Sequence, residues 1–393
     1  MSPTTTKPTA TTGKRPWRWS ETDMSQQQTG TSQQDGPSAN EQEPLLSVND
    51  LKVHFEKESQ SIFGETETIK AVDGISFDLT ERDVLVLVGE SGCGKTTLGK
   101  TAVGLQRPTE GTVTYRGQDV WTAKDRLGDI DIPFREIRQS LQIIHQDPGS
   151  SLNSHKRVRS ILEEPLIQGS EDLDWNQRRA RILGMLEHVG MAPAEDYIDR
   201  YPHQLSGGEQ QRIALVRAFL MNPDVILGDE AISALDVSLR IEMMDLMMDL
   251  QEMFDTAFLF ISHNLSNARY IAGKTGGRIG VMYLGELVEI GTVDKIINDP
   301  EHPYTRALKW ATPELDPEDA EEKDEMPIRS IDIPDPEDPP SGCPYHTRCP
   351  EAKEVCATEE PSLLETDVDE HRHQVACFRS QDDHAYWDSD PIE

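Results

Sequence analysis

The stretch that most constrains the fold runs from Val84 to Thr97 and reads VLVLVGESGCGKTT. Its five leading apolar residues predict a buried parallel strand, and a helical stretch begins at Thr97. Between them, Gly89–Thr96 fits the pattern G-x-x-x-x-G-K-[ST]. Glycines in such a loop let backbone N–H groups approach phosphate oxygens. A chance glycine turn with a surface lysine is disfavoured because a strand precedes the loop and a helix follows it. We therefore predict a nucleotide-phosphate site.

The residue types of this loop suit triphosphate and Mg²⁺. Lys95 supplies a point charge for the β- and γ-phosphates, and the Thr96 hydroxyl suits the metal. The N-terminus of the following helix favours the same anion. The predicted nucleotide contacts of the loop are Gly89, Glu90, Ser91, Gly92, Cys93, Gly94, Lys95, Thr96 and Thr97.

The chain's ends differ in composition from its middle. Residues 1–43 are rich in Thr, Ser, Gln and Pro and predict a disordered tail. No apolar run reaches the length of about 18 residues that a membrane span needs, and no signal-peptide core precedes residue 45. We expect a catalytic domain over residues 44–295 and a C-terminal extension over residues 296–393.

The net charge of −33 and the isoelectric point near 4.6 argue against nucleic acid as the main partner, because phosphate backbones need Lys and Arg. Acidic residues spread along the chain are typical of a protein from a halophile, since molar salt screens self-repulsion. Acidic loops such as Pro313–Pro340 are the alternative explanation.

Alternating patterns predict strands at Leu46–Phe55, Ile75–Leu79 and Thr112–Tyr115, which together suggest an antiparallel sheet. We expect Phe55 to lie near the phosphate loop in the fold. Its ring either stacks on a purine base or belongs to the core of this small sheet, and the sequence does not choose between the two.

A second group of signals follows the strand predicted at Leu141–His145, which ends at Gln146. A mostly helical insert is expected over about residues 150–205. Ser206 then has the N-cap position of a helix, with Glu209 at capping-box spacing. Capping alone does not explain the glycines at 207 and 208, which cost about 1 kcal/mol each in a helix. We predict that Ser206, Gly207, Gly208 and Glu209 lie against a ligand.

Two further buried strands end in polar groups at the edge of the sheet where ligands bind. Asp224–Gly228 delivers Asp229, which can hold Mg²⁺, and Glu230, which can accept a proton from an attacking water. Ala257–Ile261 ends before His263, for which we expect a catalytic role.

This set of motifs resembles the nucleotide-binding subunit of an ATP-binding cassette (ABC) transporter. Gly89–Thr96 is similar to Walker A, Gln146 to the Q-loop and Leu205–Gln210 to the signature. Val225–Glu230 is similar to Walker B, Ser233–Asp236 to the D-loop and His263 to the switch histidine. More narrowly, His302-Pro303-Tyr304-Thr305 and Val281–Gly285 resemble the dipeptide/oligopeptide importer ATPases. Three residues depart from that pattern: Ser154, Ala231 and Asn264.

The resemblance implies an α/β P-loop NTPase with a RecA-like parallel sheet, an antiparallel β subdomain, a helical insert and a small Cys-rich C-terminal extension. It implies ATP hydrolysis between two such subunits, with Lys95, Gln146, Glu230 and His263 as catalytic residues. Mg²⁺ would be held by Thr96, Gln146 and Asp229, and Asp236 would contact the nucleotide. The implied partners are a second ATPase subunit, two transmembrane permease subunits and an extracellular solute-binding protein, at the cytoplasmic face of the membrane. A soluble ATPase acting on ribosomes or DNA is the alternative.

Four of the five cysteines gather near the C-terminus, at Cys343, Cys349, Cys356 and Cys377. Disulfides are disfavoured in a reducing compartment, and zinc favours tighter pairs than these gaps of five and six residues. Four thiolates with flanking prolines suit an iron–sulfur cluster. The extension of peptide-importer ATPases looks the same, and the resemblance implies a four-iron, four-sulfur cluster, with zinc or free thiols as alternatives.

Overall fold

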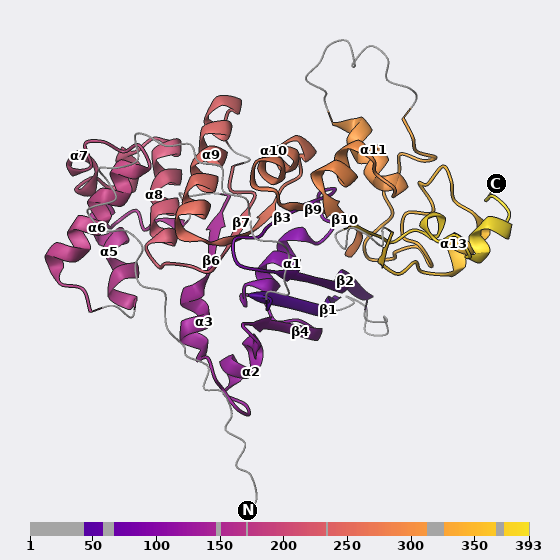
Figure 1. Ribbon diagram of the computed structural model, residues 1–393, viewed down its shortest axis with the longest axis horizontal. Helices are drawn as coiled ribbons and strands as arrows, with labels where there is room; N and C mark the ends of the chain where they lie inside the picture. Colours follow the sequence, from indigo (N-terminus) through magenta and orange to yellow (C-terminus); the bar gives the residue numbers. More distant parts are fainter. Residues whose placement is uncertain are drawn as a thin grey trace, which may run out of the picture. The chain divides into compact units, whose positions relative to one another are not determined.

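The computed structural model describes residues 43–57, 67–146, 151–169, 172–232, 235–312, 326–366 and 373–392. The tail predicted at residues 1–43 lies almost wholly outside these ranges. Residues 43–393 form one compact unit, shown in Figure 1, and the described part contains two sheets. None of the helices in the described ranges is long and apolar enough to cross a membrane.

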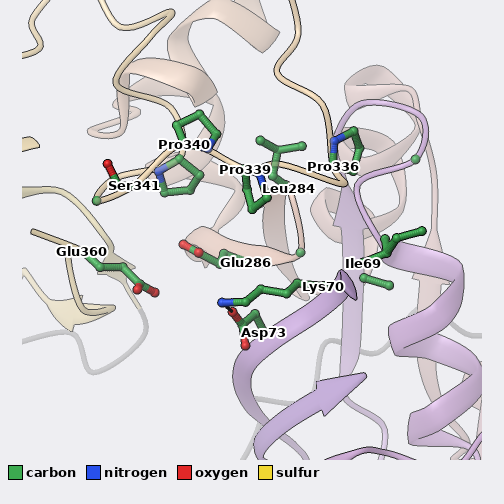
Figure 2. Close-up of a pocket in the computed structure, with 15 residues that line it drawn as sticks. Ile69, Lys70, Asp73, Leu284, Glu286, Pro336, Pro339, Pro340, Ser341 and Glu360 are labelled. Carbon is green, nitrogen blue, oxygen red and sulfur yellow. Dashed lines mark hydrogen bonds and ion pairs between the residues drawn. The ribbon is translucent and has the colours of Figure 1, made fainter. Parts of the chain in front are cut away.

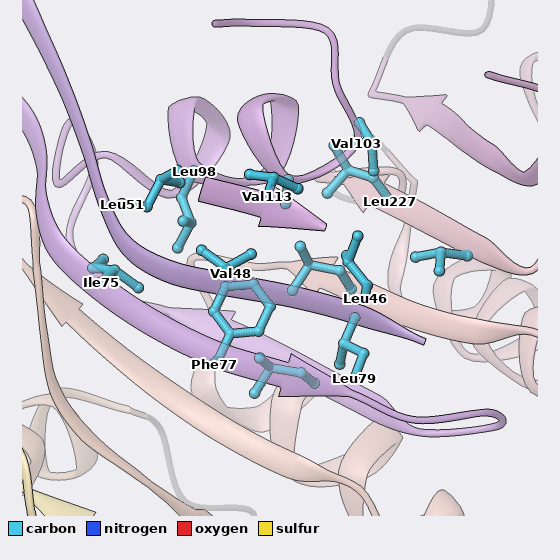
Figure 3. Packing of buried hydrophobic residues seen from close by; sticks show 14 of the residues in the cluster. Leu46, Val48, Leu51, Ile75, Phe77, Leu79, Leu98, Val103, Val113 and Leu227 are labelled. Atoms are coloured by element: carbon cyan, nitrogen blue, oxygen red, sulfur yellow. The ribbon is translucent and has the colours of Figure 1, made fainter. Parts of the chain in front are cut away.

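The smaller sheet is antiparallel, with strand order β2-β1-β4-β5. Alternate side chains of β1 and β2, such as Val48 and its partner Phe77, form the buried cluster in Figure 3. The cluster continues through Leu98 onto a helix and through Leu227 onto the larger sheet. The strands are β1 (Leu46–Lys57), β2 (Glu67–Leu79), β4 (Glu110–Tyr115) and β5 (Gln118–Asp119).

Strand β2 begins eight residues before the predicted start at Ile75, at Glu67. The alternation is hidden there because the register of β1 and β2 shifts between Val48 and His54, and Gly74 takes a positive φ of 75°. The structure therefore extends this sheet edge alongside the phosphate loop.

The larger sheet has the order β11-β12-β10-β9-β3-β8-β7-β6. Five of its strands are parallel; four of them were expected from the sequence, and three of these are the predicted buried apolar runs. These strands are β3 (Val84–Val88), β6 (Leu141–His145), β7 (Val225–Asp229), β8 (Ala257–Ile261) and β9 (Arg278–Tyr283). The antiparallel part consists of β10 (Glu286–Thr292), β11 (Leu364–Glu365) and β12 (Gln374–Val375).

Helices follow the strands at the positions that fix the site. Helix α1 begins at Lys95, two residues earlier than expected, with Gly94 as its N-cap. The other helices of this part are α2 (Val120–Asp125), α3 (Phe134–Ser140), α8 (Gly207–Phe219), α9 (Val237–Phe254) and α10 (Leu265–Thr275), and α1 ends at Ala102.

Between β6 and α8 the described chain is helical, where the insert is predicted. Asp174 and Gln177 form a complete capping box at the start of α6, and Gly190 follows that helix with a φ of 76°. Figure 1 shows these helices gathered beside α8. They are α5 (Val158–Gln168), α6 (Trp175–His188), α7 (Glu195–Ile198) and the short turn η2 (Pro202–Gln204).

The C-terminal residues join the catalytic sheet rather than forming a sheet of their own. Strand β12 pairs with β10, with Val375 opposite Glu289, and β11 pairs with β12. Short helices complete this part: η3 (Asp294–Asn298), α11 (Pro303–Ala311), α13 (Glu354–Thr358), η4 (Phe378–Ser380) and η5 (Ala385–Asp388).

Candidate nucleotide site

The loop between β3 and α1 requires glycine at particular positions. Gly89, Gly92 and Gly94 have φ values of 153°, 85° and 100°. A Cβ at Gly94 would lie 1.9 Å from the backbone oxygen of Ala71, and one at Gly89 would lie 2.2 Å from that of Met282. Because those oxygens belong to strands, they cannot move aside, so the loop shape depends on bare backbone.

Lys95 is folded onto the loop itself. Its Nζ donates hydrogen bonds to the backbone oxygens of Gly89 (2.9 Å) and Glu90 (2.8 Å), and it lies 3.5 Å from Cys93 Sγ. Only 5% of Lys95 is exposed. Burial raises the pKa of the Cys93 thiol although the lysine opposes this effect, so Cys93 is a neutral thiol at neutral pH.

Two parallel strands bring the acidic residues and the histidine to this loop. The hydroxyl of Thr96 donates to Asp229 Oδ1 at the end of β7 (2.9 Å). Glu230 follows with a φ of 49°, and its N–H donates to the carbonyl of Ile261 on β8. His263 Nδ1 lies 3.8 Å from Glu230 Oε2, which is an ion-pair separation rather than a hydrogen bond. Lys95, Thr96, Asp229, Glu230 and His263 thus share the carboxyl edge of the sheet.

The turn before α8 has the expected cap and an open face. Ser206 and Glu209 form a full capping box, and the Ser206 N–H, which donates to Glu209, lowers the pKa of that carboxyl. A Cβ added at Gly207 would meet no atom within 4 Å, so no neighbour in the described chain explains the glycine there. Among the described residues, the hydrogen bonds of Ser206 stay within its own turn.

The remaining predicted residues have varied surroundings. Gln146 is exposed just beyond β6, and Ser91 is exposed in the phosphate loop. Phe55 is 42% exposed, so its ring is not a core residue of the small sheet. Asp236 caps α9 by accepting from the Leu239 N–H, which gives it a structural role that we had not predicted. Ser233, which belongs to the predicted D-loop, lies outside the described residues.

Two residues that the sequence did not single out for this loop contact Glu90. Arg348 donates to both carboxylate oxygens of Glu90, and the Glu90 N–H donates to the hydroxyl of Tyr304. No local pattern could reveal these contacts, since 258 and 214 positions separate the partners in the chain.

A cavity of about 250 Å³ lies beside the phosphate loop, and Figure 2 shows side chains around it. Strand β2 and the turn before β10 form one side, and a proline-rich segment that includes Pro336 and Pro340 forms the other. Glu286 lines it, and burial, together with the neighbouring Glu360 and Asp73, raises the pKa of this carboxyl to about 8.

The four C-terminal cysteines line one small cavity of about 20 Å³, and all five cysteines of the chain are free. Burial raises the pKa of each of the four thiols, to about 12 for Cys349 and about 11 for Cys377. Such surroundings favour the neutral thiol as long as no metal ion is bound, because a coordinated metal would itself deprotonate its ligands. Within the described ranges, no group of three or more His, Cys, Asp or Glu side chains is arranged to hold a metal ion. The predicted cluster is therefore not supported by this geometry.

The glycine loop, the threonine–aspartate pair and the glutamate–histidine pair, at the edge of a parallel sheet, define a P-loop nucleotide-binding protein of the ABC type. The ABC transporter family matches residues 72–233, and the oligopeptide/dipeptide transporter C-terminal region matches residues 288–356.

Curated relatives are similar along most of the chain. The dipeptide transport ATP-binding protein DppF of Escherichia coli is 42% identical over 342 residues, covering 87% of this chain and 96% of that protein. The oligopeptide transport ATP-binding protein AppF of Bacillus subtilis is 38% identical, covering 86% and 98%. The chain belongs to the ATP-binding proteins of dipeptide and oligopeptide ABC transporters, and it is an ATPase.

Solved structures agree on the fold of the catalytic part. CbiO1 from Clostridium perfringens, part of the transporter complex CbiONQ, has a TM-score of 0.52 and 21% identity, covering 65% of this chain and 91% of that one. A dimeric ATP-binding cassette bound to ADP and Pi has the same TM-score and 24% identity, covering 63% and 98%.

Proposed function

We propose that this chain hydrolyses ATP to power the import of peptides through an ABC permease. The observation that carries the proposal is the joint placement of Lys95, the Thr96–Asp229 pair and the Glu230–His263 pair at one sheet edge. Relatives named as dipeptide and oligopeptide transport proteins support peptides as the transported solute. A related solute such as nickel or an oligosaccharide is the alternative within this family.

Within the site, the residues would act by positioning and by stabilising charge. Lys95 would exchange its bonds to the carbonyls of Gly89 and Glu90 for the β- and γ-phosphate oxygens of ATP. Thr96 and Asp229, already in contact, would hold Mg²⁺ together with Gln146. Glu230 would accept the proton of the attacking water, and His263 would contact the γ-phosphate. Phe55, half-exposed on β1, would stack on the adenine ring.

Glu230→Gln tests the assignment of the base. The variant should bind ATP as tightly as the wild type and turn over about 10²–10⁴-fold more slowly, which is the usual contribution of a general base. Glu252→Gln on the exposed face of α9 removes the same charge away from the site and should leave both unchanged. Wild-type hydrolysis by Glu230→Gln would refute the role of this carboxylate.

A second ATPase subunit would supply the signature turn in trans. The support is the open face at Gly207, where an added Cβ would meet nothing within 4 Å in the described part of the chain. Alanine is the better helix former by about 1 kcal/mol, so Gly207→Ala should not lower the melting temperature. If the partner's γ-phosphate lies against this turn, the same variant should hydrolyse ATP at least about ten-fold more slowly. Full activity with unchanged stability would contradict a site shared between two subunits.

The membrane partners would be two permease subunits, which in turn receive solute from an extracellular binding protein. The helical insert, with two exposed apolar side chains, Ile167 (61%) and Trp175 (53%), offers a surface for a permease helix. This would place the chain at the cytoplasmic face of the membrane as a peripheral subunit. Co-purification of the tagged chain with integral membrane proteins rather than ribosomes would support the assignment, and the reverse would exclude it.

Two further proposals rest on composition. A four-iron, four-sulfur cluster on Cys343, Cys349, Cys356 and Cys377 rests on the number and type of these side chains, and iron analysis of anaerobically purified protein tests it. A halophilic source is supported by the net charge of −33. Unfolding at low and at molar KCl tests that proposal, because equal stability in both would remove it.

A further inference from the structure

Arg348 is a buried cation that contacts the phosphate loop from the C-terminal extension. Only 5% of the residue is exposed. Its Nη1 donates to Glu90 Oε1 at 3.0 Å and to Oε2 at 2.9 Å. The guanidinium lies 5.7 Å from the ring centres of both Tyr283 and Tyr345. A buried arginine needs an anion, and Glu90 is the carboxylate that meets it.

The same extension also holds the backbone of Glu90. Its N–H donates to the hydroxyl of Tyr304 at 2.9 Å, and Tyr304 is 2% exposed. The rings of Tyr304, Tyr283 and Tyr345 pack against one another, with centroids 4.7 to 5.3 Å apart. Glu90 is therefore fixed through its side chain and its backbone by residues that follow the catalytic part of the chain.

Glu90 lies where the loop conformation matters most. It follows Gly89, and its carbonyl accepts a hydrogen bond from Lys95 Nζ, the amine expected at the phosphates. The proline-rich segment of the extension approaches the same loop, since Pro336, Pro339 and Pro340 line the cavity that Gly92 also lines (Figure 2). Two separate parts of the extension thus adjoin the phosphate loop.

We propose that the C-terminal extension is a component of the nucleotide site, in which Arg348 acts as a positioning residue that fixes the conformation of the phosphate loop through Glu90. This rests on the proposed function, in which that loop binds ATP. A loop fixed in its binding shape loses less conformational freedom when the triphosphate enters. Arg348 itself touches no phosphate in this account, because its Nη1 donates to Glu90 and to the hydroxyl of Tyr283.

The test measures the affinity of the full-length chain for MgATP by calorimetry. Arg348→Met keeps the length of the side chain and removes its charge, and Glu90→Gln removes the acceptor charge. Each should weaken MgATP binding about ten-fold, the usual effect of losing a charged hydrogen bond. The double variant should bind no more weakly than either single one, because both remove the same interaction. Arg348→Lys should recover part of the affinity.

The matched control is Arg306→Met, which breaks an ion pair with Glu351 in the same extension without touching the loop. It should bind MgATP as the wild type does. Hydrogen exchange adds a readout that a purely structural anchor would not change. MgATP should slow the exchange of residues 343–349 in the wild type but not in Arg348→Met.

Several results would overturn the proposal. The proposal fails if Arg348→Met and Glu90→Gln both bind MgATP within about two-fold of the wild type. It also fails if the losses of affinity in the two single variants add up in the double variant. If Arg348→Met does not fold, Glu90→Gln and Arg348→Lys decide alone. Lys95→Ala separates this idea from the proposed function. If it binds MgATP like the wild type, the nucleotide assignment fails, whereas normal binding by the Arg348 variants alone removes only the positioning role.

Discussion

His302 should make the folded protein sensitive to mild acid. The residue is 1% exposed, and its Nδ1 accepts the N–H of Tyr304 at the start of α11. Burial, with smaller effects from Arg379 and Arg306, lowers the pKa of His302 from 6.5 to about 3. Below about pH 6.5, His302 is therefore protonated in the unfolded chain but stays neutral in the folded chain. The free energy of unfolding is therefore unaffected by His302 above the pKa of the unfolded chain. It decreases as the pH falls towards the pKa of the folded chain.

The size of the effect follows from linkage. Each pH unit in this window costs about 1.4 kcal/mol, so His302 removes about 2 kcal/mol of unfolding free energy between about pH 6.5 and pH 5. His302→Asn keeps an N-cap acceptor but does not titrate. Urea unfolding at constant salt gives the free energy of unfolding at about pH 7 and at about pH 5. The decrease between the two should be larger by about 2 kcal/mol in the wild type than in His302→Asn. Groups that titrate in both proteins cancel in this difference. An equal loss in the two proteins would refute a neutral, buried His302.

Two further variants test other buried contacts. Gly94→Ala should abolish MgATP binding, because its Cβ would lie 1.9 Å from the carbonyl oxygen of Ala71. Gly128→Ala is the control: Gly128 also has a positive φ, but a Cβ there meets no atom within 4 Å among the described residues, so this variant should bind MgATP normally. His373→Leu should cost about 1–3 kcal/mol of unfolding free energy, because it removes a 3.0 Å partner of the fully buried Glu289. An unchanged melting temperature in that variant would show that Glu289 finds another donor.

Much of the catalytic framework could be predicted because its signals are local. The run Val84–Val88 is apolar at every position, so its burial in a parallel sheet follows from composition alone. Ser206 acts within three residues of its partner and forms the predicted capping box with Glu209. Asn264, which departs from the family pattern, still accepts the Ser266 N–H at the start of α10, so the cap is kept.

What could not be predicted depends on residues far apart in the chain. The sequence left open whether Phe55 stacks on a base or belongs to the core of the small sheet. Its exposed surface decides against the core, and the alternation of residues in β1 does not reveal that exposure. Asp236 stays a predicted nucleotide contact, and its role as the cap of α9, only three positions from Leu239, was a local feature that we had not predicted. The pairing of β12 with β10 was hidden because a strand of two residues carries no periodicity.

These distant contacts change how the C-terminal extension is understood. Strand β12 hydrogen-bonds to the edge of the catalytic sheet, and His373 reaches Glu289, which is 0% exposed on β10. Arg348 contacts Glu90 in the loop that follows β3, a strand that lies three places from β12 in the order of the sheet. An appended module would have its own boundary, yet residues 43–393 form one compact unit. Because the sheet edge and the phosphate loop both contact the extension, substitutions within it should alter nucleotide binding.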